Sequence, residues 1–283
     1  MRDRTGPGPW ADDPIEVWGE RLGVPRLEVH SVLESTNARL RELFQEGAPC
    51  FTTVVAEAQS RGRGREGKEW HSPAGVGLWL SVLVALPRGT LGSVLPLAVG
   101  IAAARTVEQL TGRTAGLKWP NDVLIDHRKV AGILCEAAGG PNAARPDHAV
   151  VGVGINLRFP PGGFPGELAH SAGVLEAYAD RPLSEPEVAR LLLDEIRSWA
   201  HPAPVGLSGR LRMEWESRDL LLDRKVRIAT GAVGIARGVS PEGALRVGCD
   251  DGTLLSVRSG GVRLERPGKA PALFRSPPSS TPS

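Results

Sequence analysis

Arginine and glycine alternate within residues 59–70, the part of the sequence with the greatest capacity for chemistry. Arg63 and Arg65 carry guanidinium groups, whose forked donors match the oxygens of phosphates and carboxylates. Gly62 and Gly64 lack a Cβ atom, so their backbone can approach a ligand closely. By itself the segment is compatible with phosphate binding and also with an ordinary solvated arginine-rich loop.

Two familiar phosphate-binding patterns overlap in this segment, and neither is complete. Gly62, Gly64 and Gly67 have the spacing of a dinucleotide-binding loop, but the residues that follow do not open a helix. The run from Gly62 to Lys68 has the spacing of a P-loop, but Glu69 stands where Ser or Thr must bind Mg²⁺. A short RGG-type nucleic-acid segment is a third alternative, which the nearly neutral chain disfavours.

Three further short motifs carry side chains that can bind a ligand. Ser35-Thr-Asn37 offers hydroxyl and amide groups that both donate and accept hydrogen bonds. Lys118-Trp-Pro-Asn-Asp122 precedes a predicted strand headed by Lys129, whose ammonium group can stabilise developing negative charge. Val151-Gly-Val-Gly-Ile-Asn156 is a predicted strand that ends in an amide side chain.

The glycine-arginine loop and these three motifs, in this order, resemble the biotin protein ligase family over about residues 30–266. The resemblance implies an enzyme that converts biotin and MgATP into biotinyl-5′-AMP and pyrophosphate. It also implies transfer of biotin to one lysine of a biotin carboxyl carrier protein domain of acetyl-CoA carboxylase or a related carboxylase. ATP with Mg²⁺ and the substrate biotin are then the expected ligands, and no tightly bound metal is expected.

The resemblance assigns expected roles to individual residues. Lys129, Arg63 and Arg65 are the expected catalytic residues, because they can place positive charge on the biotin carboxyl group and the phosphates. The expected biotin-binding residues are Ser35, Thr36, Asn37, Gln59, Gly62, Arg63, Gly64, Arg65, Lys129 and Gly132. The expected nucleotide-binding residues are Arg63, Arg65, Trp70, Lys118, Asn121, Lys129 and Asn156. Trp70 is expected to stack on adenine.

Some of these positions also have a simple structural interpretation. Ser35 and Thr36 can cap a helix, a role that is compatible with ligand binding. Gly132 can mark a β-bulge, and an isolated Lys129 would suit the exposed side of an edge strand. Asp122 can shape the site, or it can assist Mg²⁺ or the acceptor lysine.

Glu66 departs from the family pattern, which has a basic residue just after the second arginine of the loop. A carboxylate beside phosphates is unfavourable, because like charges repel. Lys68 is the nearby residue that can compensate, and the effect of Glu66 is an open question at this stage.

Two alternative functions stay open. A lipoate or octanoate protein ligase shares the core architecture, although the glycine-arginine loop together with residues 118–122 is more similar to the biotin branch. In a non-catalytic biotin-binding module, the arginines of the loop would have no phosphate to bind. Pyrophosphate release that depends on biotin, and not on lipoate, would distinguish the three functions.

A regular framework must position these motifs, and the sequence predicts a mixed α/β core. Alternating or β-branched runs predict strands over residues 26–33, 51–56, 77–85, 122–126, 129–136 and 149–157. Helices are expected from residue 35, over residues 91–110 and from residue 184. The expected fold class is a mixed sheet with flanking helices, similar to the class II synthetase and lipoate-ligase core.

The chain divides into four expected parts. Residues 1–25 form a flexible lead-in, and residues 26–216 form the catalytic domain. Short β-rich runs punctuated by glycine predict a small all-β barrel or sandwich over residues 217–266. The family resemblance implies that this part helps to hold ATP or the acceptor. Residues 267–283 are rich in Pro and Ser and are expected to be disordered.

The composition of the 283 residues is that of a globular protein, with 41% hydrophobic and 23% charged residues. A net charge of +2 and a short lead-in disfavour a DNA-reading protein. No segment suits a secretory signal or a membrane span, and three widely separated cysteines fit a reducing compartment. We therefore expect a cytoplasmic enzyme with no nucleic-acid or membrane partner, and a homodimer is possible.

Overall fold

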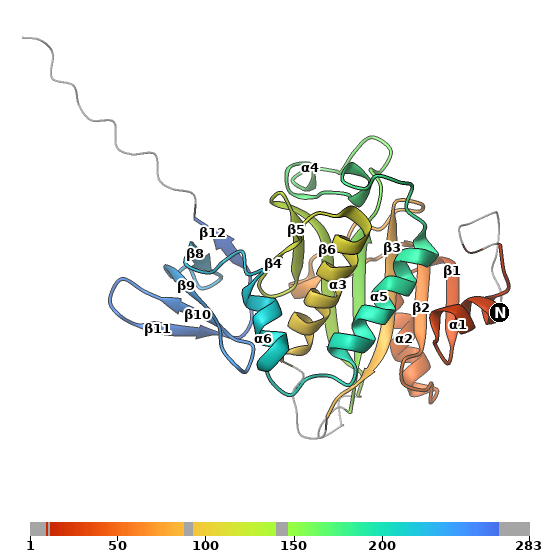
Figure 1. Cartoon of the computed structure of the whole chain (residues 1–283), viewed down its shortest axis with the longest axis horizontal. Coiled ribbons are helices and arrows are strands. Elements are labelled where there is room, and N and C mark those ends of the chain that lie inside the picture. Colours follow the sequence, from red (N-terminus) through yellow and green to blue (C-terminus); the bar gives the residue numbers. More distant parts are fainter. Residues whose placement is uncertain (1–9, 11, 88–92, 140–146, 266–283) are drawn as a thin grey trace, which may run out of the picture.

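The computed structural model describes residues 10, 12–87, 93–139 and 147–265, which form two β-sheets with helices packed around them (Figure 1). The larger sheet has seven strands in the order β1-β2-β3-β7-β6-β5-β4. The strands are β1 Leu27–Leu33, β2 Thr53–Gln59, β3 Gly77–Ala85, β4 Gly116–Lys118, β5 Asp122–Ile125, β6 Arg128–Ala137 and β7 His148–Asn156. β1 and β2 are parallel and the other neighbours are antiparallel, so the predicted mixed sheet is confirmed.

Helices cover both faces of this sheet within the described ranges. They are α1 Ile15–Leu22, α2 Thr36–Gln45, α3 Leu95–Thr111, α4 Leu168–Ser171, α5 Glu185–Ala200 and α6 Gly209–Glu216, with short 3₁₀ turns η1 Arg65–Gly67 and η2 Leu175–Ala177. Gly112 ends α3 in the left-handed conformation that favours glycine. No helix of the described part of the chain is both long enough and apolar enough to cross a membrane.

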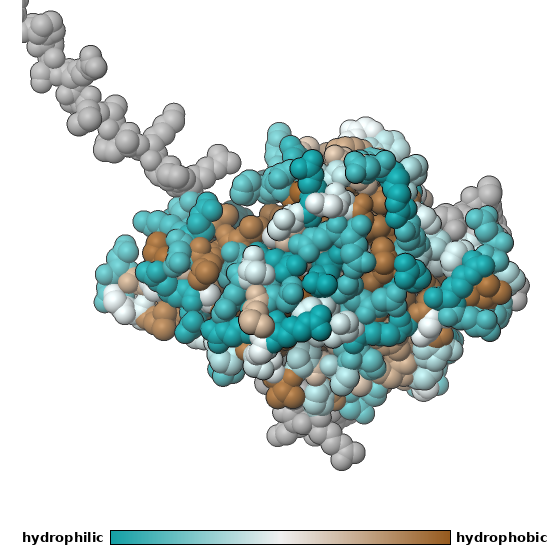
Figure 2. Space-filling model, viewed as in Figure 1, coloured by the Kyte–Doolittle hydropathy of each residue, from teal (hydrophilic) through white to brown (hydrophobic). Residues whose placement is uncertain are grey.

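The two faces of the large sheet carry separate hydrophobic clusters. α3 and α5 lie side by side over one face, and Val55 of β2 points toward them (Figure 1). The neighbouring Val54 points to the opposite face, where it packs with Leu40 and Leu43 of α2. Seen from the side of α3 and α5, the surface is mainly hydrophilic, so their apolar sides face the sheet (Figure 2).

Part of the expected flexible lead-in is helical, so that expectation is wrong for residues 15–22. α1 buries Leu22, which is 2% exposed, and Trp18 packs against the same cluster as α3 and α5. Arg197 of α5 donates a hydrogen bond to the carbonyl of Gly23 at 2.8 Å, which satisfies the end of α1. The prolines and glycines around this short amphipathic helix concealed it.

The C-terminal strands form the predicted small β unit as one antiparallel sheet, which does not close into a barrel within the described residues. The order is β11-β10-β9-β8-β12. The strands are β8 Lys225–Ile228, β9 Val233–Val239, β10 Leu245–Gly248, β11 Leu254–Val257 and β12 Val262–Leu264. Among the described residues, β12 pairs with β8 alone and β11 with β10 alone, so these short edge strands do not meet. The tail expected to be disordered lies outside the described residues.

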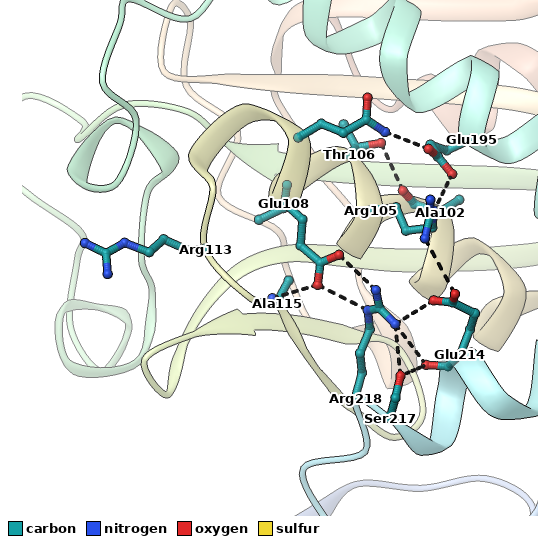
Figure 3. A network of polar contacts seen from close by, with 12 residues as sticks. Ala102, Arg105, Thr106, Glu108, Arg113, Ala115, Glu195, Glu214, Ser217 and Arg218 are labelled. Carbon is teal, nitrogen blue, oxygen red and sulfur yellow. Dashed lines mark hydrogen bonds and ion pairs between the residues drawn. The ribbon is translucent and has the colours of Figure 1, made fainter.

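An ion-pair network connects α3, α5 and α6 beside the C-terminal sheet (Figure 3). Arg218, which follows α6, contacts Glu108 of α3 at 2.9 Å and Glu214 of α6 at 2.6 Å. Arg105 of α3 contacts Glu195 of α5 at 3.2 Å and Glu214 at 3.6 Å. The side chain of Arg218 is only 12% exposed, so water screens these pairs less than pairs on an open surface. Because both sheets also share one hydrophobic cluster, the division into two domains stays a prediction.

The packing of α1 predicts that Leu22→Ala lowers the free energy of unfolding by about 2–4 kcal/mol, since it leaves a cavity in the core. Urea denaturation measures this change. Glu20→Ala on the exposed side of the same helix is the matched control and is expected to change the free energy by less than about 0.5 kcal/mol. Equal effects of the two substitutions would mean that α1 does not pack on the core in solution.

Candidate active site

A strip of the large sheet carries no side chains, and a cavity lies over it. In β7, Val151 and Val153 point into the core beneath α3 and α5, so Gly152 and Gly154 face the opposite side. Gly132 of β6 lies directly opposite Gly154 in the ladder. The cavity over these three glycines has a volume of about 340 Å³.

The indole of Trp70 lies against this glycine strip. A Cβ atom on Gly154 would come within 2.5 Å of Nε1 of Trp70, and one on Gly132 would come within 2.7 Å of the ring. Trp79 meets the indole edge to face at 6.4 Å, and Nζ of Lys129 lies 5.0 Å from the ring centroid. Nε1 of Trp70 is buried and has no hydrogen-bond partner among the described residues. The indole therefore offers an apolar wall and one unused donor.

The glycine-arginine loop folds back on itself between β2 and β3, which brings Trp70 to the cavity. The N–H of Trp70 donates to the carbonyl of Gly62 at 2.8 Å, and the N–H of Gly64 donates to Lys68 at 2.7 Å. A Cβ on Gly62 would lie 2.3 Å from the Trp70 carbonyl oxygen, and Gly62 is not among the cavity-lining residues. Glu66 adopts a left-handed conformation with φ of 58° and lines the cavity. Gly62 thus shapes the loop, and a contact with biotin is unsupported.

Buried hydrogen-bonding groups line one part of the cavity. Oε1 of Gln59 accepts bonds from the backbone N–H of Thr36 at 2.9 Å and from its hydroxyl at 3.2 Å. The fully buried hydroxyl of Ser81 lies 2.7 Å from Oγ1 of Thr36 and 2.6 Å from Oδ1 of Asn37. Ser35 precedes α2 as its N-cap residue, but its side chain makes no capping bond. The structure brings these predicted biotin-binding residues together and fixes their orientation.

Positively charged side chains gather at another part of the same cavity. Nζ of Lys129 lies 2.5 Å from Oδ1 of Asp122. Burial lowers the pKa of Lys118; the nearby Asp122 opposes this effect, whereas Lys129, Lys68 and Arg263 add to it. All five side chains line the cavity. Four cations around one carboxylate create a positive potential that attracts an anionic group such as a phosphate.

The polar part and the cationic part lie at different points along β6. Lys129 lies near the start of the strand, and Leu134 lies opposite Gly152. A Cβ on Gly152 would come within 2.3 Å of Oδ1 of Asn37. The backbone from 129 to 134 spans about 17 Å at about 3.3 Å per residue. The cavity therefore suits an elongated ligand with a hydrogen-bonding head and an anionic end.

The side-chain amides of Asn121 and Asn156, both predicted to bind the nucleotide, contact backbone carbonyl groups of β6. Nδ2 of Asn121 donates to the carbonyl of Ile133 at 2.8 Å. Nδ2 of Asn156 donates to the carbonyl of Gly173 at 3.0 Å and lies 3.4 Å from the carbonyl oxygen of Lys129. Both asparagines line the cavity. They hold the backbone that carries Lys129, and their contact with a nucleotide stays a prediction.

Sequence reasoning missed several residues of the cavity. The alternation of Val and Gly in residues 151–156 is a signal for Gly152 and Gly154, because alternate strand residues share a face. No local signal marks Arg263, which reaches the cavity from β12. Trp119 holds the C-terminal sheet beside the cavity, since its Nε1 donates to the carbonyl of Gly243 at 3.0 Å.

Comparison with known proteins gives a consistent result. The model of the Biotin/lipoate A/B protein ligase family matches residues 29–156. A biotin--[acetyl-CoA-carboxylase] ligase of Mycobacterium tuberculosis is 32% identical over 241 residues, which cover 81% of this chain and 86% of that protein. The bifunctional ligase/repressor BirA of Bacillus subtilis is 33% identical over 243 residues, covering 84% and 72%. The structure of Aquifex aeolicus biotin protein ligase in complex with biotin and ATP superposes with a TM-score of 0.67 at 27% identity, covering 85% of this chain and 100% of that one.

The fold, the cavity and these similarities define one class of protein. The chain belongs to the biotin/lipoate A/B protein ligase family. Within the family it is similar to the biotin protein ligases, which include a relative from Paracoccus denitrificans that is 32% identical.

The partly buried Lys118 predicts an effect of pH on the reaction rate. The cationic form of Lys118 is lost as the pH rises through its lowered pKa, whereas arginine stays charged. Lys118→Arg is therefore expected to move the alkaline limb of kcat/KM for MgATP to higher pH, since this parameter reports the free enzyme. Biotin-dependent pyrophosphate release between about pH 7 and about pH 10 measures it, with the exposed Lys225→Arg as control. An unmoved alkaline limb would exclude Lys118 as its cause.

Proposed function

We propose that this chain activates biotin with MgATP and transfers it to a lysine of a biotin carboxyl carrier protein domain. The observation that carries the proposal is one cavity that joins buried hydrogen-bonding groups, a glycine strip and a group of cations. The Aquifex aeolicus neighbour is a complex with biotin and ATP, which supports these two substrates. The names of the bacterial relatives specify acetyl-CoA carboxylase, which supports the acceptor.

Biotin recognition is assigned to the polar part of the cavity. The ureido ring needs both donors and acceptors in a site that excludes bulk water. Ser35, Thr36, Asn37 and Gln59 supply them, and the pairing of Thr36 with Gln59 already holds both side chains in one orientation. Gly132 leaves room at the surface of β6 for the Trp70 ring, which forms a wall of the cavity.

In the first step, the biotin carboxylate attacks the α-phosphorus of ATP. A carboxylate oxygen–phosphorus bond forms, and the bond from this phosphorus to the pyrophosphate oxygen breaks. Lys129 lies where it can neutralise the approaching carboxylate and α-phosphate, and Asp122 holds it at 2.5 Å. Lys118, Arg63 and Arg65 stabilise the charge that accumulates on the departing pyrophosphate.

In the second step, the neutral ε-amine of the acceptor lysine attacks the acyl carbon of biotinyl-5′-AMP. A carbon–nitrogen bond forms, AMP leaves with the oxygen, and the amine proton passes to solvent. The intermediate must be kept from water until the acceptor arrives. The glycine-arginine loop is proposed to supply this cover, because residues 63–66 and 68–70 line the cavity.

Mg²⁺ is proposed to enter with ATP. Within the described ranges, no three His, Cys, Asp or Glu side chains are grouped so that they could hold a metal. Asp122, Glu66 and Glu69 line the cavity and can accept hydrogen bonds from water molecules of the ion. The ion supplies charge neutralisation at the phosphates.

We also propose that the enzyme is cytoplasmic and has two domains. Residues 26–216 are proposed to form the catalytic domain, and residues 217–266 a C-terminal domain that reaches the nucleotide through the turn at 260–263. The absence of nucleic-acid and membrane partners is a prediction from composition and charge. A homodimer also stays a prediction.

Biotin-dependent pyrophosphate release tests the proposed activity, with lipoate and no added acid as controls. Release with biotin alone, followed by labelling of a carrier domain, is the expected result. Release with lipoate would assign the chain to the lipoate branch. Folded protein that releases no pyrophosphate with either acid would support a binding module instead.

Lys129→Ala is expected to reduce biotin-dependent pyrophosphate release by about 100-fold or more, because it removes a charge aimed at the reacting groups. Circular dichroism and urea denaturation check that the fold is retained. Lys225→Ala, an exposed lysine of β8, is the matched control and should leave the rate unchanged. Wild-type activity of Lys129→Ala would remove Lys129 from the catalytic role.

A further inference from the structure

Glu136, near the end of β6, connects three separate parts of the molecule. Its Oε1 lies 3.2 Å from Nη2 of Arg63 in the glycine-arginine loop and 3.1 Å from Nη2 of Arg41 in α2. Its Oε2 accepts a hydrogen bond from Nδ2 of Asn37 at 2.8 Å. The side chain is only 19% exposed, so these charge-assisted contacts are less screened than surface ion pairs.

We propose that Glu136 is a positioning residue that, through Arg63, holds the glycine-arginine loop and its Lys68 at the cavity for an anionic ligand. The ion pair uses Nη2 of Arg63, and its other two guanidinium nitrogens have no side-chain or backbone partner among the described residues. One carboxylate oxygen therefore restrains Arg63 through a single nitrogen and leaves its other donors free for a ligand. Pre-organised donors lose less conformational entropy when the ligand binds.

Arg41 gives Glu136 a second cationic partner. It contacts the same carboxylate oxygen from α2 and is not among the cavity-lining residues. Without Arg63, Glu136 would keep Arg41 and Asn37 as partners, so its partly buried charge would stay compensated. Loss of the contact with Arg63 therefore affects the loop and leaves Glu136 in place.

Hydrogen–deuterium exchange of the ligand-free protein tests the attachment directly. Glu136→Gln is expected to raise exchange in residues 62–69 about tenfold, because a charged contact is lost. The kinetic test rests on the proposed function: KM for MgATP should rise about tenfold, while the affinity for biotin changes less than about threefold. Glu136→Asp should restore part of the effect, since it retains the charge.

Arg41→Gln is the matched control, because it removes an ion pair from the same carboxylate without touching the loop. It should leave loop exchange and KM at wild-type values. Arg63→Gln breaks the contact from the half-exposed loop side and should raise exchange as Glu136→Gln does, which keeps the test valid if Glu136→Gln unfolds. Unchanged exchange in both variants, or an equal rise in Arg41→Gln, would overturn the proposal. A wild-type protein without biotin-dependent pyrophosphate release would refute the proposed function and leave the exchange result to decide this proposal.

Discussion

The site depends on the alternation of valine and glycine along β7. Val151 and Val153 fill the core beneath α3 and α5, and Gly152 and Gly154 leave the opposite face open to Asn37 and Trp70. The same strand therefore builds the core and the floor of the cavity. A register slip of one residue would put valines into the cavity and glycines into the core, so both packing and function specify the register.

The positively charged side chains of the cavity repel one another in the ligand-free protein. Lys118 and Lys129 share a partly buried environment with Lys68 and Arg263, and Asp122 compensates part of this charge. Binding of phosphate groups relieves the repulsion, so nucleotide binding should also stabilise the fold. The C-terminal sheet takes part in this balance because it carries Arg263. The C-terminal sheet must therefore lie beside the catalytic core for Arg263 to contribute its positive charge to the cavity.

Local patterns in the sequence predicted much of the fold and the candidate site, because alternation and short motifs act over a few residues. β3 spans the predicted residues 77–85, and the predicted site residues except Gly62 line one cavity. The failures concern long-range packing. Closure of the C-terminal barrel depends on whether distant edges meet, and α1 depends on the core that receives Leu22. Asn37 and Glu136 are in contact although they lie 99 positions apart in the sequence. The residues around Asn37 do not indicate its contact with Glu136, and those around Glu136 do not indicate Asn37.

The polar side chains of the cavity are paired with one another before any ligand is present. Gln59 contacts Thr36, Ser81 joins Thr36 to Asn37, and Asn37 contacts Glu136. Glu136 in turn holds Arg63, so one network extends from the biotin head group's proposed position to the phosphate-binding loop. Such a network keeps its donors and acceptors oriented, and a ligand then exchanges contacts without having to order the side chains first. In the proposed reaction, this framework would hold the biotin head group in one orientation, which is a condition for aligning its carboxylate with the α-phosphate.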